Sequence, residues 1–319
     1  MKLISSNLVR LASTLSDLEY HDGNTLGAKL NVTRSSIWKS IKKLEEHDIK
    51  IYSVKNKGYA LKEPLLLLDQ NFISKQIDNP NITIEVMEEI DSTNQYLKKN
   101  PINRKICLAE KQLNGKGRLG RSWHSPFGQN IYMSYVYNFK KDASQLNGLS
   151  LVVSIAMIYA IKEVDISIPV MLKWPNDGIW DDKKIMGNII ETQSESYGES
   201  TVIIGMGINV NMLECDDSNI SQSWTSLRKA TGKYIDRNLL CVALIHNLNM
   251  CLEQFNKYGL SYFISKWSEL DYLYNKSLKL NGDDIFGVAK GIDNNGNFLL
   301  ETAGGEVRAF PAGETSICK

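Results

Sequence analysis

A chain of 319 residues, 43% hydrophobic and 23% charged, is long enough for two or three domains that each bury a core. A formal net charge of +1 excludes a protein that is basic overall, so any nucleic-acid surface must be local. No run of about 18 apolar residues is available to span a membrane, and Asn7 and Arg10 interrupt the apolar segment that a signal peptide needs. Five scattered cysteines and four distant histidines predict a reducing cytoplasm, without a disulfide framework or a metal site made of protein ligands.

The first segment, residues 1–63, has the pattern of a winged helix-turn-helix. Apolar residues recur every three or four positions in the first helix, Asn24 or Thr25 is expected to cap the second, and Thr33 the third. A Lys-Asn-Lys-Gly turn then separates two strand-like stretches. The three helices and two strands are expected over 4–18, 26–30, 34–46, 49–54 and 59–61.

The third helix has the division of a DNA recognition helix. Ile37, Ile41 and Leu44 form an apolar side that would hold it on the domain, and residues 1–63 carry 11 Lys and Arg against 7 Asp and Glu. Alternatively, the lysines are an ordinary solvated face, or the domain binds another protein. The predicted DNA contacts are Arg34, Ser35, Ser36, Lys39 and Lys42 on the helix, with Lys55 and Lys57 on the wing.

The rest of the chain is predicted to be α+β. Strands and helices do not alternate strictly over 64–271, which indicates a mixed or antiparallel sheet, and short strands with glycine turns over 272–319 indicate a small barrel. The central elements are expected at 131–137, 146–164, 179–191 and 201–204, and the C-terminal strands at 277–280, 285–289 and 298–301.

Residues 115–121, Gly-Lys-Gly-Arg-Leu-Gly-Arg, form a glycine-spaced loop with three cations. The letters contain G-x-G-x-x-G, but Pro126 and Gly128 prevent the helix that a dinucleotide fingerprint must open, so that interpretation is rejected. Glycines let backbone N–H groups approach phosphate oxygens while Lys116, Arg118 and Arg121 neutralise their charge. The alternative is a charged surface turn.

Several motifs in family order resemble the biotin protein ligases, in particular the bifunctional members that carry an N-terminal DNA-binding domain. They are the loop from Glu110 to Trp123, Asp91-Ser-Thr-Asn94, Lys173-Trp-Pro-Asn-Asp177, Lys184-Ile-Met-Gly-Asn-Ile-Ile-Glu191, Gly205-Met-Gly-Ile-Asn209 and Pro311-Ala-Gly-Glu-Thr-Ser316. The resemblance implies a central domain like that of class II aminoacyl-tRNA synthetases and biotin ligases, and an SH3-like C-terminal barrel. Lys116, Met186 and Asn188 depart from the family pattern, and Asn188 places a polar group in a strand expected to wall the biotin pocket.

The implied reaction has two steps and needs no enzyme nucleophile. Biotin and ATP, with Mg²⁺, give biotinyl-5′-AMP and pyrophosphate. A lysine of the biotin carboxyl carrier protein of acetyl-CoA carboxylase then takes the biotin, and AMP leaves. Catalysis would come from positioning and charge, with Lys184, Arg118 and Asp177 as the implied catalytic residues. Asp177, with Asn176, would position Mg²⁺ or Lys184; alternatively Asp177 orients its hairpin.

The remaining implied contacts fall into two groups. Biotin would be held by Ser92, Thr93, Asn94, Gln112, Lys116, Gly117, Arg118 and Lys184. The adenylate would be held by Gly115, Arg121, Lys173, Asn176, Asn209 and Trp224. Trp224 is equally compatible with a plain core residue, and Trp123 is expected to pack beneath the loop.

The resemblance also implies partners and regulation. The adenylate is expected to order the loop and to favour a homodimer that binds operator DNA. Two other functions stay open: a lipoate or octanoate ligase, which shares the scaffold, and a biotin-sensing transcription regulator with weak catalysis. The cationic loop and the appended winged helix favour biotin over lipoate, and the intact Lys184, Arg118 and Lys-Trp-Pro-Asn-Asp motif favours an active enzyme.

Overall fold

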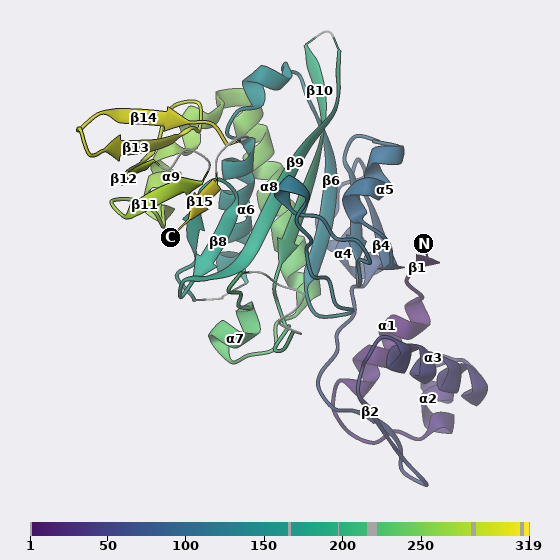
Figure 1. The fold of residues 1–319 in the computed structure, drawn as a ribbon. Coiled ribbons are helices and arrows are strands. Elements are labelled where there is room, and N and C mark those ends of the chain that lie inside the picture. The colour runs from purple at the N-terminus through teal and green to yellow at the C-terminus, as the bar shows by residue number, and fades with distance from the viewer. Residues whose placement is uncertain are drawn as a thin grey trace.

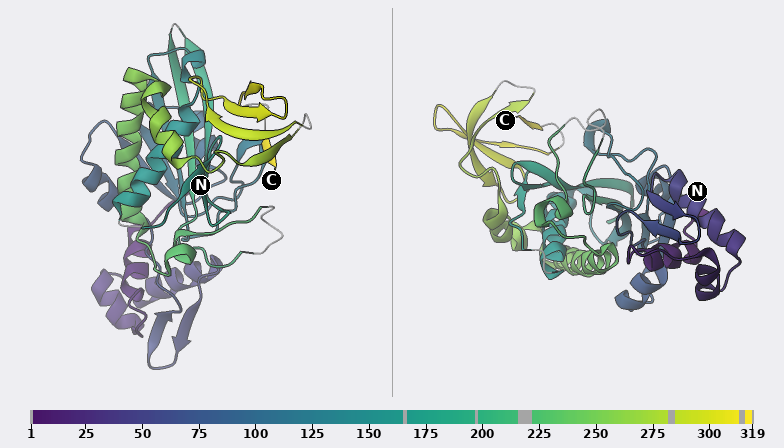
Figure 2. Two further views of the ribbon diagram at one scale, coloured as in Figure 1. Left: turned by 90° about the vertical axis from the view of Figure 1, so that its left-hand side faces the viewer. Right: turned by 90° about the horizontal axis from the view of Figure 1, so that it is seen from below.

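The computed structural model describes residues 2–164, 167–196, 198–215, 222–281, 285–312 and 316–318. Figure 1 shows three parts: a small N-terminal helical lobe, a central sheet covered by helices, and a small sheet at the C-terminal end. Seen from below in Figure 2, the N-terminal lobe and the C-terminal sheet lie at opposite ends of the central part. The expected α+β architecture is confirmed.

The N-terminal lobe is a winged helix-turn-helix. Its elements are α1 (Ser6–Leu15), α2 (Gly23–Leu30), α3 (Arg34–Glu46), β2 (Ile51–Val54) and β3 (Gly58–Leu61). Thr33 caps α3 as predicted, by accepting a hydrogen bond from the Ser36 N–H at 3.2 Å. The cap expected for α2 was wrong: Asp22 is the cap, because its carboxylate accepts from the N–H groups of Asn24 and Thr25.

The central sheet has eight strands among the described residues, in the order β1-β4-β5-β6-β10-β9-β8-β7. The pair β4–β5 is parallel and the other neighbours are antiparallel, so the sheet is mixed. The strands are β1 (Lys2–Leu3), β4 (Thr83–Glu89), β5 (Lys105–Ala109), β6 (Ile131–Phe139), β7 (Met171–Lys173), β8 (Asp177–Trp180), β9 (Lys183–Ser196) and β10 (Glu199–Ile208).

Two long helices cover one face of this sheet, as the left view of Figure 2 shows. They are α6 (Leu149–Glu163) and α8 (Arg237–Tyr258). The segment Ala143–Glu163 is long and apolar enough to cross a membrane by length and composition, but it is largely buried, because α6 packs between the sheet and its neighbours. The shorter helices are α4 (Gln70–Ile77), α5 (Thr93–Lys99), α7 (Leu227–Thr231) and α9 (Ile264–Leu270), with 3₁₀ turns at Arg118–Gly120, Ala143–Leu146 and Leu260–Phe263.

The C-terminal part is a five-stranded antiparallel sheet in the order β14-β13-β12-β11-β15. Its strands are β11 (Ser277–Asn281), β12 (Phe286–Ile292), β13 (Phe298–Thr302), β14 (Val307–Phe310) and β15 (Ser316–Cys318). Trp174 joins this sheet to the central part: its indole donates to the Gly296 carbonyl at 3.0 Å and packs on the Phe298 ring. The two parts therefore share one hydrophobic core.

Two chain segments, one before and one after the helices and wing, connect the N-terminal lobe to the central part. Before α1, the short strand β1 pairs with β4 at the edge of the central sheet, and the Ile4 N–H donates to the Val86 carbonyl at 3.0 Å. After β3, residues 62–69 run back to the central part. Ser16 binds this linker through both the N–H and the carbonyl of Leu65.

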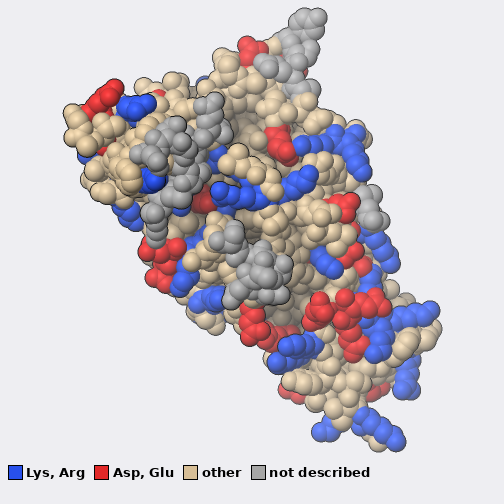
Figure 3. All heavy atoms as spheres, viewed as in Figure 1, with Lys and Arg blue, Asp and Glu red and all other residues tan. Residues whose placement is uncertain are grey.

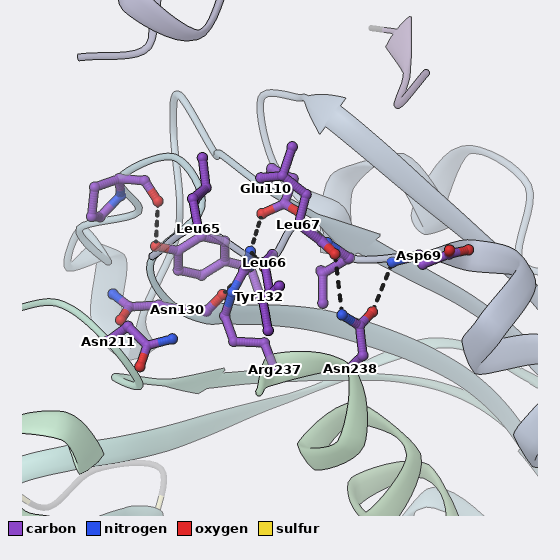
Figure 4. Close-up of polar contacts among 12 residues, drawn as sticks. Leu65, Leu66, Leu67, Asp69, Glu110, Asn130, Tyr132, Asn211, Arg237 and Asn238 are labelled. Carbon is purple, nitrogen blue, oxygen red and sulfur yellow. Dashed lines mark hydrogen bonds and ion pairs between the residues drawn. The ribbon is translucent and has the colours of Figure 1, made fainter. Parts of the chain in front are cut away.

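A buried ion pair holds the far end of this linker (Figure 4). Arg237 and Glu110 are both fully buried and lie 2.8 Å apart; Arg237 also donates to the Leu66 carbonyl at 2.9 Å, and Glu110 accepts from the Leu68 N–H. Asn238 binds the next residues of the linker. Glu110 directly follows β5, and its carbonyl accepts from the Gly128 N–H at 3.1 Å. The same residue thus closes the base of the loop 110–128 and anchors the linker.

Candidate functional site

The face of the central sheet opposite α6 and α8 has a floor of glycines. Gly187 on β9 pairs with Gly207 on β10. Gly205 lies two residues before Gly207 on β10 and so is on the same face. A side chain at Gly205 would collide with the Asn94 amide, and one at Gly207 with the Trp123 indole. These side chains therefore approach the sheet backbone more closely than any larger residue would allow.

Four polar side chains meet above this floor. Gln112 Oε1 accepts from the Thr93 N–H at 3.0 Å, and the Thr93 hydroxyl lies 2.6 Å from that of Ser134. Ser134 also binds Asn94 Oδ1. Three of the four, Thr93, Asn94 and Gln112, are among the residues predicted to hold biotin, and the fold brings them together. The sequence did not single out Ser134.

Ser92, a fourth predicted biotin contact, lies beside this group with a structural role of its own. It is buried and is the N-cap of α5, where its hydroxyl accepts from the Gln95 N–H at 3.5 Å. Because α5 begins with Thr93 and Asn94, this cap also fixes where those two side chains start. We therefore describe Ser92 as a residue that orients the cluster.

Lys184 lies at the start of β9, over the same face. Its ammonium is 2.7 Å from Asp177 Oδ1 on the adjacent strand β8 and 5.3 Å from the centre of the Trp123 ring. The side chain is only 15% exposed. Lys184 is therefore a mostly buried cation held between a carboxylate and an aromatic face, in contrast to a solvated hairpin lysine.

The loop 115–121 folds into a tight turn above Lys184. The Gly117 N–H donates to the Arg121 carbonyl at 2.7 Å, and the Trp123 N–H to the Gly115 carbonyl at 2.8 Å. A side chain at Gly115 would come within 2.5 Å of the Trp123 carbonyl, so this position requires glycine. Lys116 and Arg121 are exposed. The Trp123 ring lies against Gly207 on the floor and near Lys184; its packing beneath the turn stays a prediction.

Arg118 is the one cation of this loop that turns inward. It donates to Asn176 Oδ1 at 3.2 Å and to the Ala312 carbonyl of the C-terminal part. Burial is the largest influence on its pKa and lowers it, with Arg121 adding to this effect and Asp177 opposing it. Arg118 remains a guanidinium at neutral pH, because an arginine pKa starts far above that range.

Three predicted adenylate contacts lie around Lys184. Asn209 is buried and donates to the Thr225 carbonyl at 3.0 Å, while the backbone of Lys184 bonds to residues 223 and 225 on both sides of Trp224. Trp224 is half-buried, and the Lys229 ammonium lies 4.2 Å from its ring centre, so it is not a plain core residue. Lys173 ends β7 and pairs with Asp177 in the sheet.

The polar group of Asn188 faces away from the candidate site. Its side chain lies on the opposite face of β9 from the glycine floor and donates to the Ser154 hydroxyl of α6 at 2.8 Å and the Ser150 carbonyl at 3.1 Å. Neighbouring residues of a strand point to opposite faces, so with Gly187 on the floor Asn188 must face the helix. Met186 is also buried in the main core. Neither departure from the family pattern alters the floor.

The predicted DNA contacts form an exposed surface on the N-terminal lobe. Arg34, Ser35, Lys39, Lys42, Lys55 and Lys57 are exposed and Ser36 is half-buried. In Figure 3 the lysine and arginine atoms at the lower tip of the molecule mark the wing. Lys42 is paired with Glu45 at 2.6 Å, which leaves it a weaker candidate. Trp38 on α3 and Tyr52 on β2 are each about half exposed on this lobe, and no role was predicted for them.

The other end of α3 contacts the central part. Lys43 and His47 both bind Glu88 of β4, and the His47 ring stacks on Phe127 with 3.9 Å between ring centres. Phe127 lies just before Gly128, at the base of the loop 110–128. The view that Lys43 is an ordinary solvated face of the helix was therefore wrong.

Comparisons with known proteins agree with this architecture. Residues 86–209 match the biotin/lipoate A/B protein ligase family, residues 13–60 an HTH domain, and residues 277–317 the biotin protein ligase C-terminal domain. The bifunctional ligase/repressor BirA of Salmonella typhimurium is 38% identical over 96% of this chain and 96% of its own length. The chain belongs to this family of bifunctional biotin ligase/repressors. The Escherichia coli protein of the same name is 37% identical, over 97% of this chain and 96% of its own.

A solved structure shares the central and C-terminal fold. The biotin protein ligase of Aquifex aeolicus in complex with biotin and ATP is 29% identical to this chain, with a TM-score of 0.66. The match covers 74% of this chain and 99% of that one. Of the closing Pro311-Ala-Gly-Glu-Thr-Ser316 motif, residues 313–315 lie outside the described residues.

Proposed function

We propose that the glycine-floored face of the sheet is where biotin and ATP are joined to give biotinyl-5′-AMP. The observation that carries this proposal is the convergence of two shielded cations, Lys184 and Arg118, beside the neutral polar cluster of Thr93, Asn94 and Gln112. A carboxylate and a triphosphate repel each other, and fixed cations in a poorly solvated place offset that repulsion more strongly than they would in water. Membership of the family supports the same reaction.

Different residues of the site bind biotin, the phosphates and the adenine. The polar cluster binds and orients the ring of biotin, Lys184 directs its carboxylate toward the α-phosphate, and Arg118 covers the mixed anhydride against water. Trp224 and Asn209 receive the adenine. Backbone N–H groups and positive charge for the phosphates come from Gly115, Lys116, Gly117 and Arg121, and Lys173 and Asn176 are further contacts of the adenylate.

Mg²⁺ fits this site as a companion of ATP. Among the described residues, no group of three or more His, Cys, Asp or Glu is placed to hold a metal ion. Asp177 is a single carboxylate, and one carboxylate with substrate phosphates and waters is a usual way for proteins to hold Mg²⁺. When bound, the ion would neutralise phosphate charge.

The direct experiment mixes the protein with Mg-ATP and biotin, lipoate or octanoate in separate reactions and looks for the acyl-adenylate by mass spectrometry. We expect biotinyl-adenylate and release of pyrophosphate. An adenylate formed only with lipoate or octanoate would identify the alternative ligase, and none with any acid would favour a biotin-sensing regulator with weak catalysis.

We further propose that the product acts on DNA binding. Biotinyl-adenylate would order the loop 110–128, favour a homodimer in the cytoplasm and strengthen binding of the winged helix to operator DNA. The support is structural continuity: Glu110 and Phe127 at the base of the loop contact the linker and α3. Biotin would pass to the biotin carboxyl carrier protein of acetyl-CoA carboxylase.

This coupling is tested by measuring operator affinity and sedimentation with and without the adenylate. A tighter complex and a larger species are expected with it. Equal affinity in both conditions would rule out the coupling but leave the ligase activity untouched.

A further inference from the structure

Trp38 is the one exposed tryptophan of this chain. All six tryptophans lie among the described residues; Trp174 and Trp267 are buried and three others are partly buried, whereas 51% of the Trp38 surface is exposed. No described residue forms a hydrogen bond, a ring stack or a cation–π contact with its indole. An indole left in water forgoes the stabilisation that its large apolar surface gives when it is buried. The fold of the single chain therefore gives this side chain no role.

The position of Trp38 is the middle of the exposed side of α3. Arg34 lies one turn before it and Lys42 one turn after it, and the nearby Ser35 and Lys39 are exposed as well. Residues three or four apart on a helix are neighbours on its surface, so these polar side chains flank the indole. A single exposed apolar residue is ordinary on a protein surface. An aromatic ring among cations at the centre of a predicted recognition helix is a more specific arrangement.

The charge around the indole selects the kind of partner. Residues 34–44 contain one arginine and three lysines but no Asp or Glu. Lysine is depleted in interfaces between proteins, so this surface fits a protein partner poorly. The major groove of DNA fits it well, because phosphates run along both of its rims and the base edges lie between them. With α3 in the groove, the cations would meet the rims and Trp38 would meet the base edges.

We propose that Trp38 is a specificity-determining residue of the winged helix, whose indole packs on the C5-methyl group of a thymine. The inference rests on the proposed binding of operator DNA and adds the base that is read. In the major groove the thymine methyl is the apolar group of the base edges, and the other groups there are hydrogen-bond donors and acceptors. The neighbouring cations attract a duplex of any sequence, and Trp38 adds the preference for one.

The test compares DNA binding by the unaltered protein and by Trp38→Ala, both with biotin and Mg-ATP present. The unaltered protein first selects duplexes from a random-sequence pool, and each thymine of a selected duplex is then replaced in turn by uracil, which lacks the methyl group. At one or more positions, uracil should weaken binding by the unaltered protein about fourfold, the equivalent of one buried methyl group. Trp38→Ala should bind the selected duplex about tenfold more weakly and should be indifferent to the same replacement.

Matched controls separate this contact from attraction by charge and from damage to the fold. Because Trp38→Ala removes no charge, it should keep the slope of log affinity against log salt and the affinity for duplexes of random sequence. Trp38→Phe keeps an apolar ring and should restore part of the sensitivity to uracil. Tyr258→Ala, at an aromatic residue of α8 that is 50% exposed, should bind DNA normally. Unchanged biotinyl-adenylate synthesis by each variant shows that it is folded.

Three results would count against the inference. One is an equal effect of uracil on the unaltered protein and on Trp38→Ala, and another is a selected duplex in which no thymine is sensitive to uracil. The third is a Trp38→Ala protein that binds DNA normally but sediments as a smaller species, because the indole would then lie between two copies of this chain. If the unaltered protein bound no duplex at all, the proposed DNA binding would itself be wrong, and the inference with it.

Discussion

Lys183 and Lys184 are adjacent in the sequence but differ in solvent exposure and in the groups that they contact. Lys183 is about half exposed and pairs with the exposed Asp181 at the tip of the hairpin. Lys184 is largely buried, 2.7 Å from Asp177 and over the Trp123 ring. The pair is therefore a natural comparison for separating local charge from catalytic position.

We expect Lys184→Met to lower the rate of biotinyl-adenylate formation by about 10²- to 10³-fold, because the variant loses a preorganised charge that faces the reacting groups. Lys183→Met should have nearly the normal rate. The measurement is single-turnover adenylate synthesis with saturating biotin and ATP. Equal rates for the two variants would show that Lys184 is not in the reaction.

A second residue-scale prediction concerns the buried contact between Asn188 and Ser154. Asn188 Oδ1 has no partner among the residues that the structure describes, and Ser154→Ala would remove one of the two acceptors of its NH₂ group. The free energy of unfolding should fall by about 1–3 kcal/mol, the usual cost of an unsatisfied buried group. Ser268→Ala, at an exposed serine that bonds back to its own helix, should change it by less than about 0.5 kcal/mol in the same urea titration.

At the scale of elements, two ion pairs connect the linker region to the central part, and they are unequal. Arg237–Glu110 is fully buried, whereas Arg228–Glu63 is largely open to solvent on the Glu63 side. Both have a separation of 2.8 Å. Distance alone therefore does not distinguish them, but solvent exposure does.

Arg237→Met is expected to lower the free energy of unfolding by about 3–5 kcal/mol, because it leaves Glu110 charged and buried. Arg228→Met should cost no more than about 1 kcal/mol, the range of exposed pairs. Chemical denaturation measures both. If Arg237→Met with Glu110→Gln were less stable than Arg237→Met alone, the uncompensated charge would not be the cause.

The contact of α3 with β4 gives a pH dependence. Burial alone would raise the pKa of Glu88, but hydrogen bonds from His47 and Lys43 outweigh it and lower the pKa below its usual value. A lowered carboxyl pKa contributes stability above about pH 4.3, the unfolded value, and that contribution disappears as the pH falls through the folded pKa.

Glu88→Gln should therefore be less stable than the unaltered protein at pH 7, and the difference should shrink below about pH 4. Thermal unfolding of both proteins across this range provides the measurement. A difference that is constant with pH would mean that the Glu88 charge does not contribute.

The sequence predicted elements better than contacts between them. The bounds of α3 were predicted correctly, because Thr33 is a strong cap and the apolar spacing is regular. For α2, Asp22, Asn24 and Thr25 can all cap, and only the backbone conformation selects Asp22. The sequence could not predict that Asn188 faces α6, because a motif does not tell which face of a strand a residue occupies.

Within the candidate site, the motifs identified the residues but not their partners. Arg118 reaches Ala312, 194 positions later, and Asn94 reaches Glu191, 97 positions later. Such pairings depend on the order of strands in the sheet, which local patterns do not encode. Ser134 could have been suspected as a polar residue in the mostly apolar strand β6. Glu191 closes one of the motifs, but the motif does not indicate its partner on α5.

At the scale of the whole molecule, α3 serves two surfaces at once. Lys39 is exposed on the predicted DNA side, whereas Lys43, one helical turn further, binds Glu88 of the central part. Both lysines lie on α3 and carry the same charge. Substituting each in turn therefore separates the contribution of DNA contact from that of docking against the central part.

Lys39→Ala should reduce the slope of log affinity against log salt for operator DNA by about 1, the effect of one lost phosphate contact. Lys43→Ala should leave that slope unchanged and instead make the protein easier to unfold. Fluorescence anisotropy at several salt concentrations measures the slope. An equal loss of slope in both variants would place Lys43 on the DNA.

The double fastening of the N-terminal lobe, through β1 and through residues 62–69, limits how it can move. With both connections intact, the lobe can rotate only about the line that joins them, and it must first break the contacts of Lys43 and His47 with Glu88 and Phe127. Reorientation of α3 is then a rotation about a single axis, described by one angle. In a dimer, the distance between the two recognition helices would be set by that one angle, and the spacing of DNA half-sites would follow from it.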